Sequence, residues 1–279
     1  MSLKKFLIEE LSGLIPEDLL RLIPSRFPIL GDVVLIRLGQ NLLRYGSLIG
    51  QKILSYLDRI KGVWAIVSTE RVIRQPKTIW LAGDRCPIVR HKELGTYFMF
   101  DVSRITFSPG NMGERKKLIE IVGDGESVLD MFACVGNLSL PLAINRELEL
   151  IYFLEINHYA YKFLIHNIVM NKVQSKAIPL PINNLYFREE NVVDHVLMGY
   201  LPCPSLEQVM VAIRACKQEG MIHIHTLARK GLEHEKCVEY VDFIKNQGVK
   251  IIDYTWEIVK SYSPTRNHIV ARIQIEKKN

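Results

Sequence analysis

The sequence predicts a doubly wound, Rossmann-like α/β protein preceded by a small N-terminal α/β domain. An apolar run ends at Asp130 and leads through a short loop to Gly136 and an apolar helical pattern. A second apolar run, residues 150–154, ends at Glu155. From about residue 111 onward, strand and helix patterns alternate. Such alternation is typical of a mainly parallel sheet with helices on both faces.

The first third of the chain is predicted to form a small α/β module. Its expected elements are a helical segment over residues 3–23, at risk of interruption at Pro16 and Pro24, a turn followed by a strand within residues 29–37, a helix over residues 41–57, and strands over residues 62–67 and 78–82. A further strand, residues 98–103, is expected beyond this module. The second helix has the apolar spacing of a crossover helix. Residues 88–95 are expected to form a linker. We therefore predict two domains, residues 1–96 and residues 97–279.

The larger domain is predicted to contain five strands that alternate with helices, followed by a terminal pair of strands. The five strands are expected to end near Asp130, Glu155, Pro179, Met198 and His225, with helices such as residues 159–170 and 206–219 between them. Residues 251–254 and 268–275 are expected to pair as a hairpin.

The composition limits the class of protein. The chain has 279 residues, enough for two domains, and no apolar run approaches the roughly 18 residues of a membrane span. Acidic residues at positions 9 and 10 favour an amphipathic N-terminal helix over a signal peptide. The five cysteines have no CxxC spacing and the histidines do not cluster, so we expect no metal, no disulfide and a reducing cytoplasm.

The positive charge is unevenly distributed. Residues 1–96 hold 15 Lys+Arg and 9 Asp+Glu, a net charge of +6, whereas residues 97–279 hold 21 of each. Such asymmetry favours a polyanionic partner for the first domain. The alternative is a solvated surface with a chance bias.

The loop from Asp130 to Gly136 is the predicted ligand site. A glycine there lets the backbone approach a ligand closely. Glu155, at the end of the next strand, is placed to accept hydrogen bonds from both hydroxyls of a ribose. Because no GxGxxG or P-loop pattern is present, an adenosine-containing ligand is favoured over a dinucleotide. The alternative is a plain turn that binds nothing.

Residues 107–115 (Phe-Ser-Pro-Gly-Asn-Met-Gly-Glu-Arg) predict a rigid turn and a helix start. Asn111 and Glu114 fit a capping box. Arg115 then lies in the first helical turn, where the helix dipole disfavours a cation, so its position needs a reason such as pairing with a carboxylate. The alternative is a solvent-exposed arginine.

Two further loops that follow predicted strands carry polar or aromatic residues. Asn183 and Asn184 are able to bond the edge of an adenine, or else belong to an ordinary Asn-rich turn. Tyr200 is placed to stack on a base, or else covers the edge of the sheet.

Together these motifs resemble a known family. The chain is similar to the archaeal wybutosine-synthesis enzymes that transfer a 3-amino-3-carboxypropyl group from S-adenosylmethionine to tRNA, and to the related tRNA guanine-37 N1-methyltransferases. The resemblance runs from residue 23 onward, and residues 100–115, 130–136, 155–157, 167–173 and 261–268 carry it, with His91-Lys-Glu-Leu-Gly95 resembling a His-Arg-Glu-Asn-Gly element.

Two segments favour the first group. Met198-Gly-Tyr200 stands where the methyltransferases carry an Asn-Leu-Pro or Asn-Pro type of loop, and Ser108-Pro-Gly stands where they tend to have Pro-Arg. We also expect the extra N-terminal domain of many methyltransferases to be absent. One departure is Asn183-Asn184-Leu185, where the family usually has Asp-Asn-Arg.

The resemblance implies a class I methyltransferase fold, S-adenosylmethionine as co-substrate, no metal, and tRNA(Phe) carrying 4-demethylwyosine at position 37 as the partner. It implies that Arg115 orients the methionyl carboxylate and that Tyr200 stacks on the base. The expected cofactor-binding residues are Ser108, Arg115, Phe132, Val135, Gly136, Glu155, Asn183, Asn184 and Met198. A cytoplasmic monomer is expected. The alternatives are a guanine-37 N1-methyltransferase and a non-catalytic tRNA-binding module.

Overall fold

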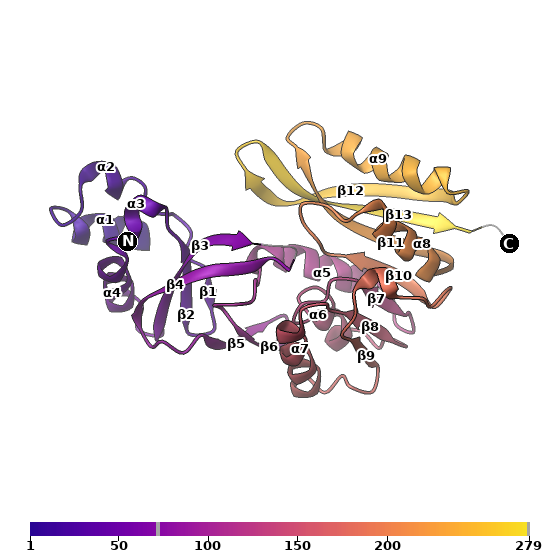
Figure 1. Cartoon of the computed structure of the whole chain (residues 1–279), viewed down its shortest axis with the longest axis horizontal. Helices are drawn as coiled ribbons and strands as arrows, with labels where there is room; N and C mark the ends of the chain where they lie inside the picture. Colours follow the sequence, from indigo (N-terminus) through magenta and orange to yellow (C-terminus); the bar gives the residue numbers. More distant parts are fainter. Residues whose placement is uncertain (71–72, 278–279) are drawn as a thin grey trace. The chain divides into compact units, whose positions relative to one another are not determined.

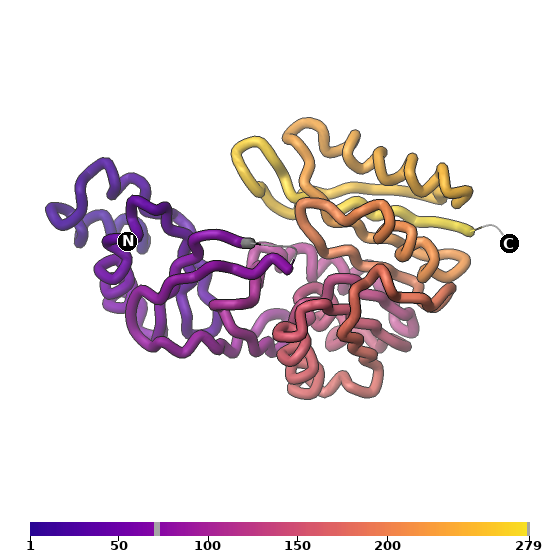
Figure 2. The backbone as a smooth tube through the Cα atoms, viewed as in Figure 1, coloured from indigo at the N-terminus to yellow at the C-terminus, as the bar shows by residue number. Residues whose placement is uncertain are grey.

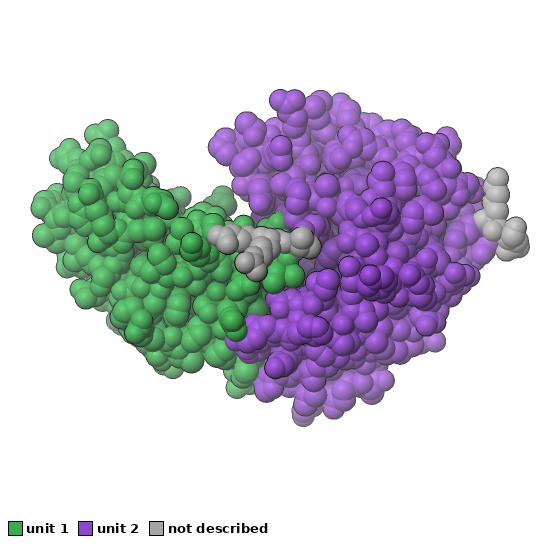
Figure 3. Space-filling view, in the orientation of Figure 1, with its two compact units in different colours: residues 1–92, 97–107 green, residues 93–96, 108–279 purple. Residues whose placement is uncertain are grey.

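The computed structural model describes residues 1–70 and 73–277. Its contacts divide the chain into two compact units (Figure 3). The first unit comprises Met1–Lys92 and Tyr97–Phe107, and the second comprises Glu93–Thr96 and Ser108–Asn279. The chain therefore passes between the units three times, after residues 92, 96 and 107, whereas a single boundary after residue 96 was predicted.

The first unit contains a four-stranded sheet and four helices (Figure 1). In chain order, these helices and strands are α1 (Leu3–Leu11), α2 (Glu17–Leu20), β1 (Ile29–Leu30), β2 (Val33–Arg37), α3 (Gln40–Leu43), α4 (Gly46–Tyr56), β3 (Gly62–Glu70) and β4 (Gln75–Gly83). Strands β2 and β3 are parallel neighbours, which confirms a helical crossover between them. Leu7, Leu11, Ile36, Ile49 and Ile53 are fully or almost fully buried in its core.

The predicted linker at residues 88–95 is wrong, because those residues form most of a hairpin. Strands β5 (Ile88–Glu93) and β6 (Thr96–Asp101) make a two-stranded sheet. Leu94 and Gly95 join them with φ values of +50° and +78°, as in two-residue hairpin turns. Burial alternates along both strands, so their sequence has the period of a half-buried strand despite its many charges.

The second unit is a seven-stranded sheet with helices on both faces, which confirms the predicted Rossmann-like fold. Its strands are β7 (Val128–Asp130), β8 (Ile151–Leu154), β9 (Ala177–Leu180), β10 (Val193–Met198), β11 (Cys216–Arg229), β12 (Lys250–Ser263) and β13 (Arg266–Glu276). They are arranged in the order β12-β13-β11-β10-β7-β8-β9. Strands β7 to β11 run parallel, whereas β13 is antiparallel to both β11 and β12.

The helical segments of the second unit connect these strands. They are η1 (Pro109–Asn111), α5 (Met112–Ile121), α6 (Ser139–Asn145), α7 (His158–Met170), η2 (Asn184–Tyr186), α8 (Leu206–Ala215) and α9 (Glu233–Asn246). Helix α8 is shorter than predicted because β11 begins directly at Cys216. Figure 2 follows the backbone of the long β12–β13 hairpin that closes the chain.

The two faces of this sheet have different chemistry. Ala271, Ile273 and Ile275 of β13 lie in an apolar core together with residues of α8 and α9. Arg272, between them on the strand, bonds instead to Glu114 of α5. Successive residues of a strand point to opposite faces, so one face is apolar and the other carries a polar layer.

In the part of the chain that the structure describes, no helix is both long enough and apolar enough to cross a membrane.

Candidate active site at the ends of the parallel strands

Strands β7, β8 and β9 follow one another toward one edge of the sheet, whereas β10 lies on the other side of β7. The strand order therefore reverses between β7 and β10. In open α/β sheets, ligands bind outside the carboxyl ends of the strands at such a switch point. The loops after β7, β8, β9 and β10 meet this description, and most of the predicted site residues lie in them.

Asp130, the last residue of β7, holds both ends of the following loop. Its Oδ1 accepts a hydrogen bond from Phe132 N at 3.0 Å, and its Oδ2 accepts one from Ser139 Oγ at 2.6 Å. The residue is 1% exposed, and burial raises the pKa of its carboxyl to about 6. Asp130 therefore shapes the loop rather than contacting a ligand.

The loop then turns sharply at Gly136, where φ is +90°. A Cβ atom at this position would lie 2.7 Å from Leu140 Cβ, so the start of α6 packs against a residue without a side chain. Asn167 of α7 donates to Val135 O at 3.1 Å and holds the loop from the other side. Val135 is fully buried, and its side chain belongs to the interior of the protein.

Glu155 ends β8 and reaches into the same loop. Its Oε2 accepts from Cys134 N at 2.7 Å and its Oε1 accepts from Asn157 N at 2.6 Å. Burial raises the pKa of this carboxyl to about 7. A carboxylate has about four acceptor positions. Two acceptor positions therefore remain on a partly exposed side chain, and a bond from them to a ribose stays a prediction.

The two asparagines after β9 have different surroundings. Asn184 is buried, donates to Met131 O at 2.9 Å and accepts from Gln208 Nε2 at 3.0 Å, so both ends of its amide bind protein groups. Asn183 is partly exposed and its Oδ1 accepts from Leu185 N at 3.0 Å. For Asn183, the amide nitrogen is thus the better placed atom for an adenine edge. Both adenine contacts stay predictions.

An aromatic pair connects the ends of β7 and β10. The rings of Phe132 and Tyr200 are stacked, with centroids 5.0 Å apart and planes inclined by 21°. Both residues are partly exposed. Met198 is fully buried in the apolar core, and its carbonyl accepts a hydrogen bond from Tyr200 N.

Arg115 has the carboxylate partner that its place near the helix start predicted. Its Nη1 lies 2.6 Å from Glu93 Oε1, and both side chains are almost completely buried. Its Nη2 donates to Ser108 O at 3.1 Å, and its Nε donates to Asn137 O. The guanidinium therefore ties the β5–β6 turn and the turn before α5 to the loop after β7. A direct grip on a methionyl carboxylate stays a prediction.

The capping box predicted for α5 is not formed. Asn111 makes no side-chain capping bond and instead accepts from Lys260 Nζ at 2.7 Å, because the turn η1 precedes the helix. Glu114 is turned into the polar layer, where its Oε2 lies 2.6 Å from Arg272 Nη2. Desolvation raises the pKa of Glu114 to about 7 although Arg272 opposes the shift. The sequence pattern gave no indication of this buried ion pair.

Histidines complete the polar layer. His195 Nδ1 lies 3.0 Å from His223 Nε2, and His225 Nδ1 lies 2.9 Å from His268 Nε2. His223 and His225 share one face of β11, as predicted, and burial lowers the pKa of both imidazoles well below the usual value. Over the described ranges, no three His, Cys, Asp or Glu side chains are grouped to hold a metal ion.

Sequence profiles match nearly the whole chain. The profile described as TRM5/TYW2 methyltransferase domain matches residues 89–252, and that described as TYW2 N-terminal domain matches residues 7–86. The chain belongs to the TRM5/TYW2 family. This membership confirms the resemblance inferred from the motifs.

Individual members of the family show the same similarity. The chain is 32% identical to the tRNA(Phe) (4-demethylwyosine(37)-C(7)) aminocarboxypropyltransferase of Pyrococcus horikoshii, over 96% of each chain. The crystal structure of P. horikoshii TYW2 in complex with MeSAdo superposes with a TM-score of 0.80 and 30% identity, over 99% of this chain and all of that one. Trm5b from Pyrococcus abyssi superposes with a TM-score of 0.84 and 28% identity, over 94% of this chain and 78% of that one.

Proposed function

We propose that this chain transfers the 3-amino-3-carboxypropyl group of S-adenosylmethionine to 4-demethylwyosine at position 37 of tRNA(Phe). The observation that carries the proposal is the match to the P. horikoshii aminocarboxypropyltransferase, which spans almost the full length of both chains. The match of residues 7–86 to the TYW2 N-terminal domain supports the same assignment for the first unit.

The chemistry depends on which carbon of the sulfonium faces the base. All three carbons attached to the sulfur are electrophilic, and the one held in line at about 3–3.5 Å from the nucleophile reacts. In this transfer, a bond forms between the base carbon and the methionyl γ-carbon while the bond from the γ-carbon to sulfur breaks. Methylthioadenosine leaves, and the base carbon loses a proton.

The site residues suit this orientation in distinct ways. Glu155 binds the ribose hydroxyls, and Asn183 bonds the adenine edge. The stacked pair of Phe132 and Tyr200 offers an aromatic surface to the acceptor base. Arg115 acts as a positioning residue, because its bond to Asn137 O holds the loop that must fix the methionyl end.

An experiment with two labels tests the proposal. Purified protein is incubated with tRNA containing 4-demethylwyosine and with S-adenosylmethionine labelled either on the methyl or on the carboxyl carbon. Carboxyl label is expected in the tRNA, methyl label is not, and methylthioadenosine is the expected by-product. Methyl label in guanine 37 of unmodified tRNA, with S-adenosylhomocysteine as by-product, would instead support the second candidate, a guanine-37 N1-methyltransferase, which the similarity to Trm5b favours.

We further propose that the chain acts as a cytoplasmic monomer, with tRNA held by the first unit and S-adenosylmethionine by the second. Light scattering of the purified protein checks the oligomeric state. Retained affinity for S-adenosylmethionine argues against a non-catalytic tRNA-binding module.

A further inference from the structure

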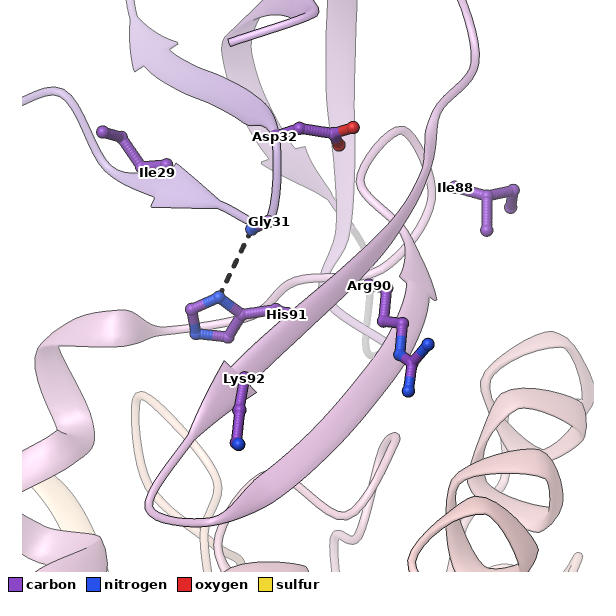
Figure 4. Close-up of a pocket in the computed structure, with 7 residues that line it drawn as sticks. All are labelled: Ile29, Gly31, Asp32, Ile88, Arg90, His91 and Lys92. Atoms are coloured by element: carbon purple, nitrogen blue, oxygen red, sulfur yellow. Dashed lines mark hydrogen bonds between the residues drawn. The ribbon is translucent and has the colours of Figure 1, made fainter. Parts of the chain in front are cut away.

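A hollow of about 640 Å³ lies on the first unit, beside strand β5 (Figure 4). Its walls come from the β1–β2 turn and from β5, and its polar groups include Arg90, His91 and Lys92. None of the residues proposed above for S-adenosylmethionine lines it. The hollow therefore needs an explanation of its own.

The β1–β2 turn is seated tightly on β5. Gly31 has a φ of +61°, and a Cβ atom at this position would lie 2.6 Å from Arg90 O. Gly31 N donates to His91 Nδ1 at 3.4 Å, and Figure 4 shows the imidazole turned toward that nitrogen. Only glycine allows this approach, so the turn holds the backbone of Arg90 in place.

The charges in the hollow are unbalanced. Arg90 and Lys92 are exposed, and within residues 1–70 and 73–277 neither has a carboxylate partner. Both lie over the ring of Tyr97, with the guanidinium carbon 4.5 Å and the ammonium nitrogen 4.8 Å from its centroid. Asp32, the acidic residue in the lining, pairs with Lys61 Nζ at 2.9 Å. The hollow is therefore positively charged.

We propose that this hollow binds a phosphodiester of the RNA backbone. The arginine fork binds two phosphate oxygens, the lysine adds a point charge, and the shared aromatic ring keeps both cations close together. Ile29 and Ile88, which are 45% and 38% exposed, lie in the lining and offer apolar contact to the adjoining sugar. The inference rests on the proposed tRNA substrate and locates one of its contacts.

The test measures tRNA affinity of the full chain as a function of salt concentration. Each phosphate contact contributes about one unit to the slope of log affinity against log salt. Arg90→Gln and Lys92→Gln are each expected to weaken binding several-fold at low salt and to reduce the slope by about one unit. Arg90→Lys keeps the charge without the fork, so it is expected to retain the slope and lose part of the affinity.

Arg44 supplies a matched control. It is exposed and lies 4.9 Å from the ring centroid of Tyr45, but it is outside the hollow. Arg44→Gln is expected to leave the slope at the wild-type value. An equal loss in Arg44→Gln, or no loss in the two hollow variants, would overturn the assignment.

Two further measurements distinguish a failure of the proposed phosphate site from a failure of the proposed function. Millimolar inorganic phosphate, at constant ionic strength, is expected not to displace tRNA; displacement would make the hollow a site for free phosphate and overturn the proposal. Group transfer by the wild type is measured in parallel. If the wild type transfers the group normally and the salt slopes of the variants are unchanged, only the proposed phosphate site is refuted. If the wild type binds tRNA but transfers nothing, the proposed function is refuted.

Discussion

The loop after β7 and the hollow beside β5 differ in how far their charged side chains are buried. Around the loop, Asp130, Glu155 and Arg115 are largely buried, and each binds backbone or side-chain groups of the protein. In the hollow, Arg90 and Lys92 are exposed and contact only an aromatic ring among the interactions described. Largely buried charges that bond to the protein determine the shape of a site, whereas exposed cations without carboxylate partners are available to a polyanion.

The largest expected effect comes from breaking the buried ion pair. Arg115→Ala removes the cationic partner of the buried Glu93 carboxylate, which should lower the free energy of unfolding by about 3–5 kcal/mol. The change should also reduce the rate of transfer more than the affinity for adenosine, since the arginine acts on loop position. Arg90→Ala is the control and should stay within about 0.5 kcal/mol of wild type. Urea unfolding measures both variants. Equal destabilisation would contradict the conclusion that Arg115 is a buried, paired charge and Arg90 is not.

The pH dependence of stability should follow from the buried carboxyls of the second unit. Burial raises the pKa of Glu114 from 4.5 to about 7, so between these values the folded protein binds more protons than the unfolded chain. The free energy of unfolding should therefore fall as pH rises through this window, by up to roughly 3 kcal/mol for one carboxyl.

The glutamine in Glu114→Gln does not titrate, so this variant should show a smaller fall in the free energy of unfolding with pH. Asp130 and Glu155, whose pKa values are also raised, should still contribute to that fall. Denaturant unfolding at several pH values measures the effect. Arg90→Gln should leave the slope intact, and an unchanged slope in Glu114→Gln would exclude this carboxyl as its source.

Removing the proposed ribose contact should have a smaller effect. Glu155→Ala removes an acceptor for charge-assisted hydrogen bonds, so the binding free energy of S-adenosylmethionine should weaken by roughly 1.5–3 kcal/mol. Glu155→Gln keeps one carbonyl acceptor and should lose less. Calorimetry on the folded variants tests this, and wild-type affinity in Glu155→Ala would rule out the ribose role.

The smallest expected effect concerns the aromatic pair. Phe132→Leu keeps an apolar side chain but loses the stacking on Tyr200, which is worth about 0.5–1.5 kcal/mol. The free energy of unfolding should fall by no more than this amount, and if the pair receives the acceptor base, KM for tRNA should also rise several-fold. A lower free energy of unfolding with unchanged KM would instead assign the pair a structural role.

The local features of the candidate site were predictable from the sequence. The strand, loop and helix around Asp130 and the acidic end of β8 follow from short-range periodicity and turn chemistry. The charged hairpin at residues 88–95 was missed because its turn contains Leu94 at positive φ, a conformation that a sequence pattern does not reveal.

The sequence by itself therefore determined the fold class, the position of the ligand loop and the excess of positive charge in the first third of the chain. Only the tertiary structure decided which groups meet: Glu93 as the partner of Arg115, Arg272 as the partner of Glu114, and Gly31 against the backbone of Arg90. Glu114 and Arg272 are separated by 158 positions along the chain. Local propensities do not specify such pairs, because they form only when the folded sheet brings distant segments together.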